Sequence, residues 1–259
     1  MCALFKFTKP RPSVAEGVQS PPPELKEAQL AAASYGQRTG GDSHDYIRVS
    51  PSRVLFAMLD VPGRVDQNRA IVAAAQSMLH SCGTQLLVDD DVNEADAMIE
   101  VCVQMNRAIL KAAERVCSCA AFAGCYNETL GTVCYVNAGH TPALLRDQTG
   151  IIELGPTGLP LGLFSHSAAD ASIVALEPGA ALLLVSRGLV EARRKTQEFG
   201  LPRVKEILVG TPGQSAQEIC ATVIERVNEF LAHVPAQNDG TVIALARSAA
   251  GKSFAASSS

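Results

Sequence analysis

Two aspartates that could hold a divalent cation lie near the ends of predicted strands. Asp42 follows a pair of glycines, and Asp60 closes the apolar run 54–59. A hairpin folded at Pro51 would bring both carboxylates to one end of a sheet. Hard divalent cations such as Mg²⁺ and Mn²⁺ prefer clusters of oxygen ligands of this kind. The spacing therefore indicates a candidate metal site at that end of the sheet.

The segments around these aspartates predict a mixed arrangement of strands and helices. Apolar residues recur with helical spacing from 65 to about 82 and from 98 to 109, where Asn93 is a candidate cap. A last helix is predicted from Ser215, with Glu218 completing a capping box. Two adjacent helices followed by a run of strands favour antiparallel layers over a repeating βαβ fold. Strands are expected at 29–35, 53–59, 119–126, 131–137, 142–146, 172–177, 180–186 and 241–246.

Length and composition set limits on what the chain can bind. Its 259 residues, 47% of them hydrophobic, suffice for one large α/β domain or two small ones. A net charge of −4 without a basic stripe argues against nucleic acid as a partner. The sequence contains no apolar run of the roughly 18 residues that a membrane span needs. We therefore expect a cytoplasmic location and no membrane partner.

The composition also suggests how the chain is divided. Residues 1–24 are rich in proline and are expected to form an extended arm. Residues 25–247 are expected to form one domain, and the Ser- and Ala-rich residues 248–259 a disordered tail. The eight cysteines are scattered, and the closest pair, Cys117 and Cys119, is predicted to diverge. Buried free thiols in a reducing cytoplasm are the preferred interpretation.

Five short sequence blocks follow one another along the chain. They lie at 40–45, 59–63, 137–145 and 159–162, and in pieces at 178–179, 182–188, 190–193 and 198–200. Together they resemble the PPM-type metal-dependent protein phosphatases, and within that family the bacterial SpoIIE-like group. The block at 137–145 is the most specific of the five. The resemblance implies an α+β fold, the αββα sandwich of two antiparallel sheets flanked by helix pairs.

The resemblance also implies a chemistry and a set of ligands. In this family two Mg²⁺ or Mn²⁺ ions hold and activate a water that attacks phosphoserine or phosphothreonine, and they offset the repulsion between hydroxide and phosphate. By matching positions, Asp60 resembles the aspartate that bridges both ions, and the carbonyl of Val61 resembles the backbone ligand beside it. Asp42 resembles the first acidic ligand, and Asp239 is an acid retained before the last strand.

Two positions depart from the family pattern. Arg187 stands where the family has the aspartate of Thr-Asp-Gly, and Asn238 stands where it has the first of two aspartates. At most one metal site is then expected, and no residue is assigned a catalytic role. The planar guanidinium of Arg187 matches carboxylate geometry, so we expect it within salt-bridge reach of Asp60 or Asp42 as an internal counter-ion.

Three smaller features have a functional and a structural interpretation. Arg187 and His140 are possible phosphate contacts, although a structural hydrogen-bond donor is the preferred interpretation of His140. The basic run 193–195 is expected at a solvated helix end. The acids 89–91 are expected to be loop and cap residues before a helix rather than a cation cluster.

Two classes of function follow. One is a protein serine/threonine phosphatase with weakened or lost catalysis that acts on a small phosphorylated regulator. The other is a non-catalytic pseudophosphatase that binds a regulatory protein, in its phosphorylated or unphosphorylated form. A third, weaker alternative is hydrolysis with one retained ion, in which Asp239 serves as a shifted ligand.

Overall fold

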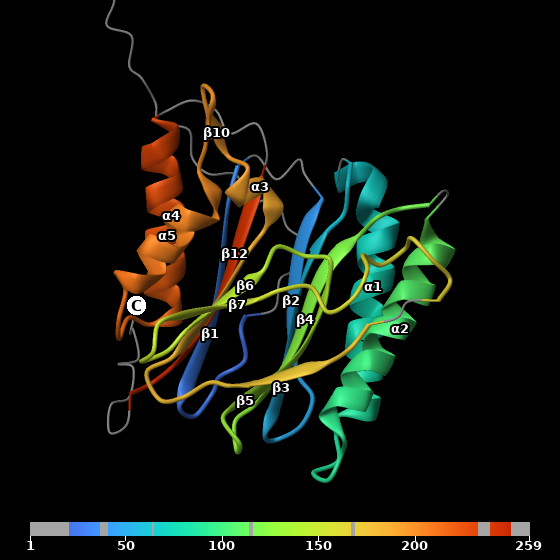
Figure 1. Cartoon of the computed structure of the whole chain (residues 1–259). Helices are drawn as coiled ribbons and strands as arrows, with labels where there is room; N and C mark the ends of the chain where they lie inside the picture. The colour runs from blue at the N-terminus through green and yellow to red at the C-terminus, as the bar shows by residue number, and fades with distance from the viewer. Residues whose placement is uncertain are drawn as a thin grey trace, which may run out of the picture.

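Two antiparallel five-stranded sheets lie face to face, and a pair of helices covers the outer face of each (Figure 1). The computed structural model describes residues 21–36, 41–63, 65–113, 116–166, 169–232 and 239–249, with the side chains of 65–67 left out. This is the αββα sandwich that the sequence resemblance implied. Most of the expected arm, Asn238 and most of the expected tail lie outside the described residues.

The first sheet contains the predicted hairpin. Its strand order is β2 (Asp42–Arg48), β3 (Arg53–Asp60), β4 (Ala120–Asn127), β5 (Thr132–Ala138) and β8 (Ser172–Ala175). The second sheet has the order β1 (Ala28–Tyr35), β12 (Gly240–Arg247), β9 (Ala181–Val185), β6 (Ala143–Arg146) and β7 (Ile151–Leu154). The first and last predicted strands, far apart in sequence, pair along their whole length in the second sheet.

The helices are α1 (Val65–Leu86) and α2 (Glu94–Ala112) on the first sheet, and α4 (Gly200–Val209) and α5 (Ala216–Leu231) on the second. The side chain of Asn93 accepts hydrogen bonds from two backbone N–H groups of the first turn of α2, as its predicted cap role requires. Ser215 and Glu218 form the predicted capping box. None of the helices in the described part of the chain combines the length and apolar character that a membrane crossing requires.

Two local expectations were wrong. The basic run 193–195 lies in a small hairpin of β10 (Arg193–Arg194) and β11 (Gln197–Glu198), where Lys195 takes the turn with φ +57°. The strand β7 was not predicted, because its outward residues are too polar or exposed to stand out from the neighbouring loop.

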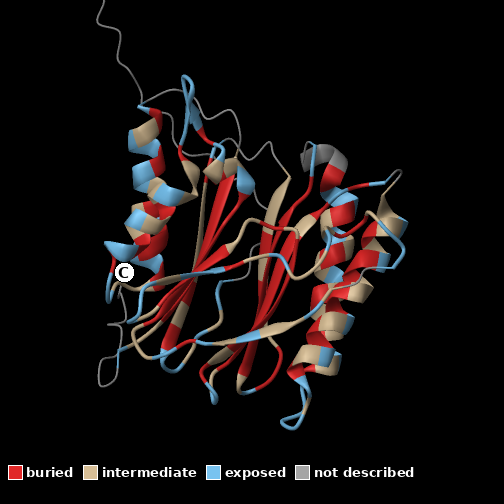
Figure 2. Cartoon of the chain, in the orientation of Figure 1, coloured by how far each residue is buried: buried red, intermediate tan, exposed pale blue. Residues whose placement is uncertain are grey.

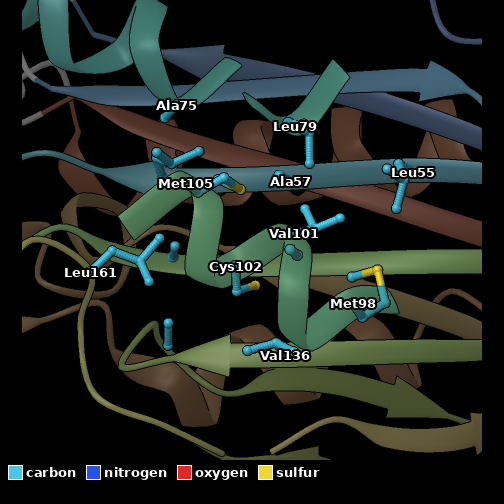
Figure 3. Packing of buried hydrophobic residues seen from close by; sticks show 14 of the residues in the cluster. Leu55, Ala57, Ala75, Leu79, Met98, Val101, Cys102, Met105, Val136 and Leu161 are labelled. Atoms are coloured by element: carbon cyan, nitrogen blue, oxygen red, sulfur yellow. The ribbon is translucent and has the colours of Figure 1, made fainter. Parts of the chain in front are cut away.

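The core has three layers, in keeping with two sheets and two helix layers. Buried residues line the inner faces of both sheets and the inner faces of the helices (Figure 2). Between the sheets the rings of Phe122 and Tyr135 stack with centroids 5.3 Å apart. Between the first sheet and its helices, Leu55 and Ala57 of β3 pack against Met98 and Val101 of α2 (Figure 3). Each fully buried large side chain contributes about 1.5–3 kcal/mol, so this packing fixes the strand ends that carry the candidate site.

Candidate functional site

Asp42 and Asp60 lie directly opposite each other at one end of the first sheet. They are register partners at the start of β2 and the end of β3. The two strands are joined by a tight turn in which the N–H of Val49 donates to the carbonyl of Arg53 at 3.1 Å. The hairpin predicted at Pro51 is therefore confirmed, and with it the pairing of the two acids.

Arg187 approaches this pair from the second sheet. It is the first residue of the short α3 (Arg187–Val190), which follows β9; Ser186 occupies the N-cap position without a capping hydrogen bond from its side chain. Two hydrogen bonds tie Ser186 to Thr241 of β12: the Ser186 N–H donates to the Thr241 carbonyl at 2.9 Å, and the Thr241 N–H donates to the Ser186 Oγ at 3.0 Å. The hydroxyl of Tyr35 donates to the carbonyl of Gly188 at 3.0 Å. These contacts fix the backbone from which the Arg187 side chain extends.

The Arg187 guanidinium forms an ion pair with Asp60. Its Nε lies 3.1 Å from Oδ2 of Asp60, with 60% of the arginine side chain and 10% of the aspartate side chain exposed. The predicted counter-ion contact is therefore confirmed. The charge of Asp60 is balanced by a residue of the same chain.

Asp42 has a different environment from its partner. The pKa of Asp42 is raised to about 7, mainly by burial; hydrogen bonds with the side chains of Ser186 and Thr241 oppose the rise, and the charges of Asp60 and Asp239 add to it. Its Oδ2 is buried and has no hydrogen-bond partner. Asp42 therefore holds its proton to a higher pH than an exposed aspartate does.

Asp239 lies at the same end, just before β12. Its Oδ1 lies so close to Gly36 that a Cβ on that glycine would be 2.2 Å away, and Gly36 has a φ of +100°. Burial, followed by the charges of Asp42 and Asp239, raises the pKa of Tyr35 to about 12. The fold thus brings Asp42, Asp60 and Asp239 to one end of the two sheets, where Arg187 pairs with Asp60.

The carbonyl of Val61 takes part in a hydrogen bond within the protein. The Nδ2 of Asn68, in the first turns of α1, donates to this carbonyl at 3.2 Å and to the carbonyl of Pro62 at 3.1 Å. A Cβ at Gly41 would lie 1.6 Å from the Val61 oxygen, so only glycine fits there. Asn68 was not predicted to take part in the site, because its burial and its contact with Val61 depend on the position of α1 beside the end of β3.

His140 is buried at the same end of the structure. Its ring Nδ1 is 3.0 Å from the carbonyl oxygen of Thr141, and its backbone N–H donates to Oδ1 of Asn137 at 2.8 Å. Burial lowers the pKa of His140, with opposing contributions from the Thr141 hydrogen bond and the charge of Asp60. A neutral ring donating from Nδ1 leaves Nε2 as an acceptor, and this atom is buried without a partner. The arrangement agrees with the structural interpretation, because a neutral ring brings no charge to a phosphate.

These residues do not fit a centre with two divalent ions. In the part of the chain that the structure describes, His, Cys, Asp and Glu side chains form no group of three or more suited to holding a metal ion. The guanidinium lies against the acid that would bridge both ions. Two unit charges about 4 Å apart interact by about 4 kcal/mol at an effective dielectric of about 20, and a divalent ion doubles this repulsion. A single-ion site with Asp42, Asp60, Val61 and Asp239 stays a prediction.

The two antiparallel sheets and their flanking helix pairs match the fold of PP2C-type, or PPM-type, domains of known structure. The PP2C domain of SiaA from Pseudomonas aeruginosa aligns with a TM-score of 0.69 at 15% identity, covering 84% of this chain and 85% of that one. The RsbU and RsbW domains of Rv1364c from Mycobacterium tuberculosis align with a TM-score of 0.67 at 23% identity, covering 87% of this chain and 62% of that one.

Sequence comparison gives the family. The profile of the Stage II sporulation protein E (SpoIIE) family matches residues 50–248, and the chain belongs to this family. Protein IcfG from Synechocystis is 30% identical over 131 residues, which cover 49% of this chain and 20% of that protein. The chain thus matches about a fifth of the length of this curated relative.

Proposed function

We propose that this SpoIIE-like domain acts in bacterial regulatory signalling as a pseudophosphatase. It retains the PPM-type fold, its hydrolysis of phosphoserine or phosphothreonine is weak or lost, and it binds a regulatory protein at the former substrate face. The ion pair between Arg187 and Asp60 is the observation that carries this proposal. No step of hydrolysis is assigned to the residues present.

The charge of the site is unsuited to phosphate hydrolysis. In related enzymes two divalent ions hold a hydroxide beside a phosphate dianion, which needs a strongly positive site. Here one guanidinium faces Asp60, with Asp42 and Asp239 nearby. The net charge of this group is negative whether Asp42 is protonated or charged. It supplies neither an activated water nor compensation for an incoming dianion.

The same charges favour one form of the partner. Arg187 is 60% exposed, so a bound protein can reach it. A phosphate on that protein would be attracted to Arg187 but repelled by Asp239 and by Asp42 in its charged form. We therefore expect the unphosphorylated form of the regulatory protein to bind more tightly than the phosphorylated form.

A second candidate function is weak hydrolysis with one ion. The unpartnered Oδ2 of Asp42 favours it, since a buried carboxylate oxygen without a donor is suited to a cation. Asp239 would then serve as the shifted ligand. The ion would need to compete with Arg187 for Asp60.

Both candidates are tested by Mn²⁺ calorimetry together with hydrolysis of an aryl phosphate. For the pseudophosphatase we expect no heat of binding and the same background rate in the wild type and in Asp60→Ala. Steady turnover that Asp60→Ala abolishes would contradict the pseudophosphatase. Loss of that turnover in Asp239→Asn as well would establish the single-ion alternative.

A further inference from the structure

Cys117 and Cys119 lie side by side just before β4. Their Sγ atoms are 3.5 Å apart and in hydrogen-bond contact. The expectation that these side chains diverge was wrong, because residues two apart in an extended chain lie on the same face. The sulfurs are free thiols and need to approach by about 1.5 Å to reach the bond length of a disulfide, about 2.05 Å.

The two thiols differ in access to solvent. Cys117 is 9% exposed and lies between the exposed residues Val116 and Ser118, whereas Cys119 is 0% exposed. Burial raises the pKa of the Cys119 thiol well above its usual range, with further contributions from its contact with Cys117 and from the charge of Asp60. Both residues are therefore buried, and Cys117 is the more accessible of the two.

The pair is built into the border of the candidate site. Cys119 precedes Ala120, the register partner of Asp60. Its N–H and carbonyl exchange hydrogen bonds of 2.8 Å with Leu161, whose side chain packs beside Met105 and Cys102 of α2 (Figure 3). A Cβ at Gly162 would lie 2.4 Å from the carbonyl oxygen of Cys117. Both cysteines therefore lie against the 159–162 loop, and Cys119 adjoins the residue paired with Asp60.

We propose that Cys117 and Cys119 form a reversible thiol–disulfide site that reacts with low-molecular-weight disulfides. The Cys117 thiolate attacks one sulfur of the reagent RSSR, which forms Cys117–S–S–R and releases one RSH after protonation. Cys119 then loses its proton and attacks the Cys117 sulfur, which forms the Cys117–Cys119 bond and releases the second RSH. Two protein thiols are oxidised by two electrons, and one RSSR is reduced to two RSH.

Other cysteines are less suited to this reaction. Cys125 and Cys134 are register partners on β4 and β5, but both are 0% exposed in the core. Cys82, on α1, is a partly exposed free thiol. Transient disulfides that sense redox conditions do occur in reducing compartments, so such a site is compatible with the expected location.

The test uses the full chain with Cys2→Ser and Cys82→Ser, treated with glutathione disulfide and analysed by mass spectrometry after alkylation. We expect loss of two hydrogens, no retained glutathione, a bond mapped to Cys117 and Cys119, and full reversal by a dithiol reductant. Adding Cys119→Ser should trap glutathione on Cys117. Adding Cys117→Ser should leave Cys119 unmodified under the same conditions.

Three outcomes would overturn the proposal. Glutathione that stays on Cys117 in the parent chain would show that Cys119 does not resolve it. Full alkylation of both thiols after treatment would show that the pair does not react. Modification of Cys119 at the parent rate in the Cys117→Ser chain would remove the assigned order. The parent chain alone decides the first two outcomes, so they do not depend on the folding of either added variant.

Discussion

The Nε of Arg187 lies 3.1 Å from Oδ2 of Asp60, and this ion pair joins the two sheets of the sandwich. Arg187 follows the end of β9 in the second sheet, whereas Asp60 ends β3 in the first. The arginine thus connects the sheet ends with a charge that the chain itself provides.

Replacing Arg187 should destabilise the fold modestly. We expect Arg187→Ala to lower the free energy of unfolding by about 0.5–2 kcal/mol, because an exposed partner contributes little but the largely buried Asp60 loses its counter-ion. Urea denaturation measures the change. Arg193→Ala, which removes an exposed ion pair with Glu198, is the matched control and should change stability by less than about 0.5 kcal/mol. Equal losses in both variants would contradict the structural role of Arg187.

Removal of metal should leave the melting temperature unchanged. A ligand that binds only the folded state raises stability with its concentration, and we expect no such ligand here because Arg187 already balances Asp60. Thermal melts with chelator and with millimolar Mn²⁺ should coincide. A rise in melting temperature with Mn²⁺ that Asp60→Ala removes would refute this expectation.

The combined variant Arg187→Asp with Asn238→Asp should bind Mn²⁺. It restores the two carboxylates that the family pattern has and this chain lacks, while Asp42 and Asp60 remain in place. Each single variant should bind Mn²⁺ much more weakly than the combined variant does. The gain in the combined variant should exceed the sum of the two single gains, since carboxylates around one ion act together. Calorimetry measures the binding. If the combined variant shows no heat of binding, the proposed correspondence of positions is wrong.

Asp42 should make stability depend on pH. Burial raises its pKa from 3.8 to about 7 in the folded protein, so its contribution to stability is fully present below the unfolded pKa and is lost as pH rises through about 7. Between about pH 5 and pH 8 the wild type should lose on the order of 2–3 kcal/mol more than Asp42→Asn. Denaturation at a series of pH values gives both curves. Parallel curves would show that Asp42 does not titrate in this range.

Much of the site followed from the sequence because its parts are local. The hairpin around Pro51 brings Asp42 opposite Asp60 by register alone, and the Ser215 capping box depends on residues three apart. The contact between Arg187 and Asp60 joins distant segments. Its prediction required the family resemblance, which placed both residues at one metal centre.

The remaining features depend on contacts that no local pattern encodes. Asn68 reaches the Val61 carbonyl only because α1 begins beside the end of β3. The raised pKa of Asp42 results mainly from the burial that packing creates, and hydrogen bonds with Ser186 and Thr241 of the other sheet oppose this rise. By contrast, the proximity of the Cys117 and Cys119 side chains could have been predicted from the sequence, because side chains two residues apart in an extended chain lie on the same face.

Because Arg187 belongs to the same chain as Asp60, the effective concentration of its guanidinium near Asp60 is fixed by the fold. A group tethered near its partner has an effective concentration on the order of millimolar or higher. This value does not change with dilution, with the ion content of the surroundings or with the supply of transition metals. A freely diffusing cation must compete for Asp60 against this constant local concentration, so the state of the sheet junction follows from the folding of the domain alone.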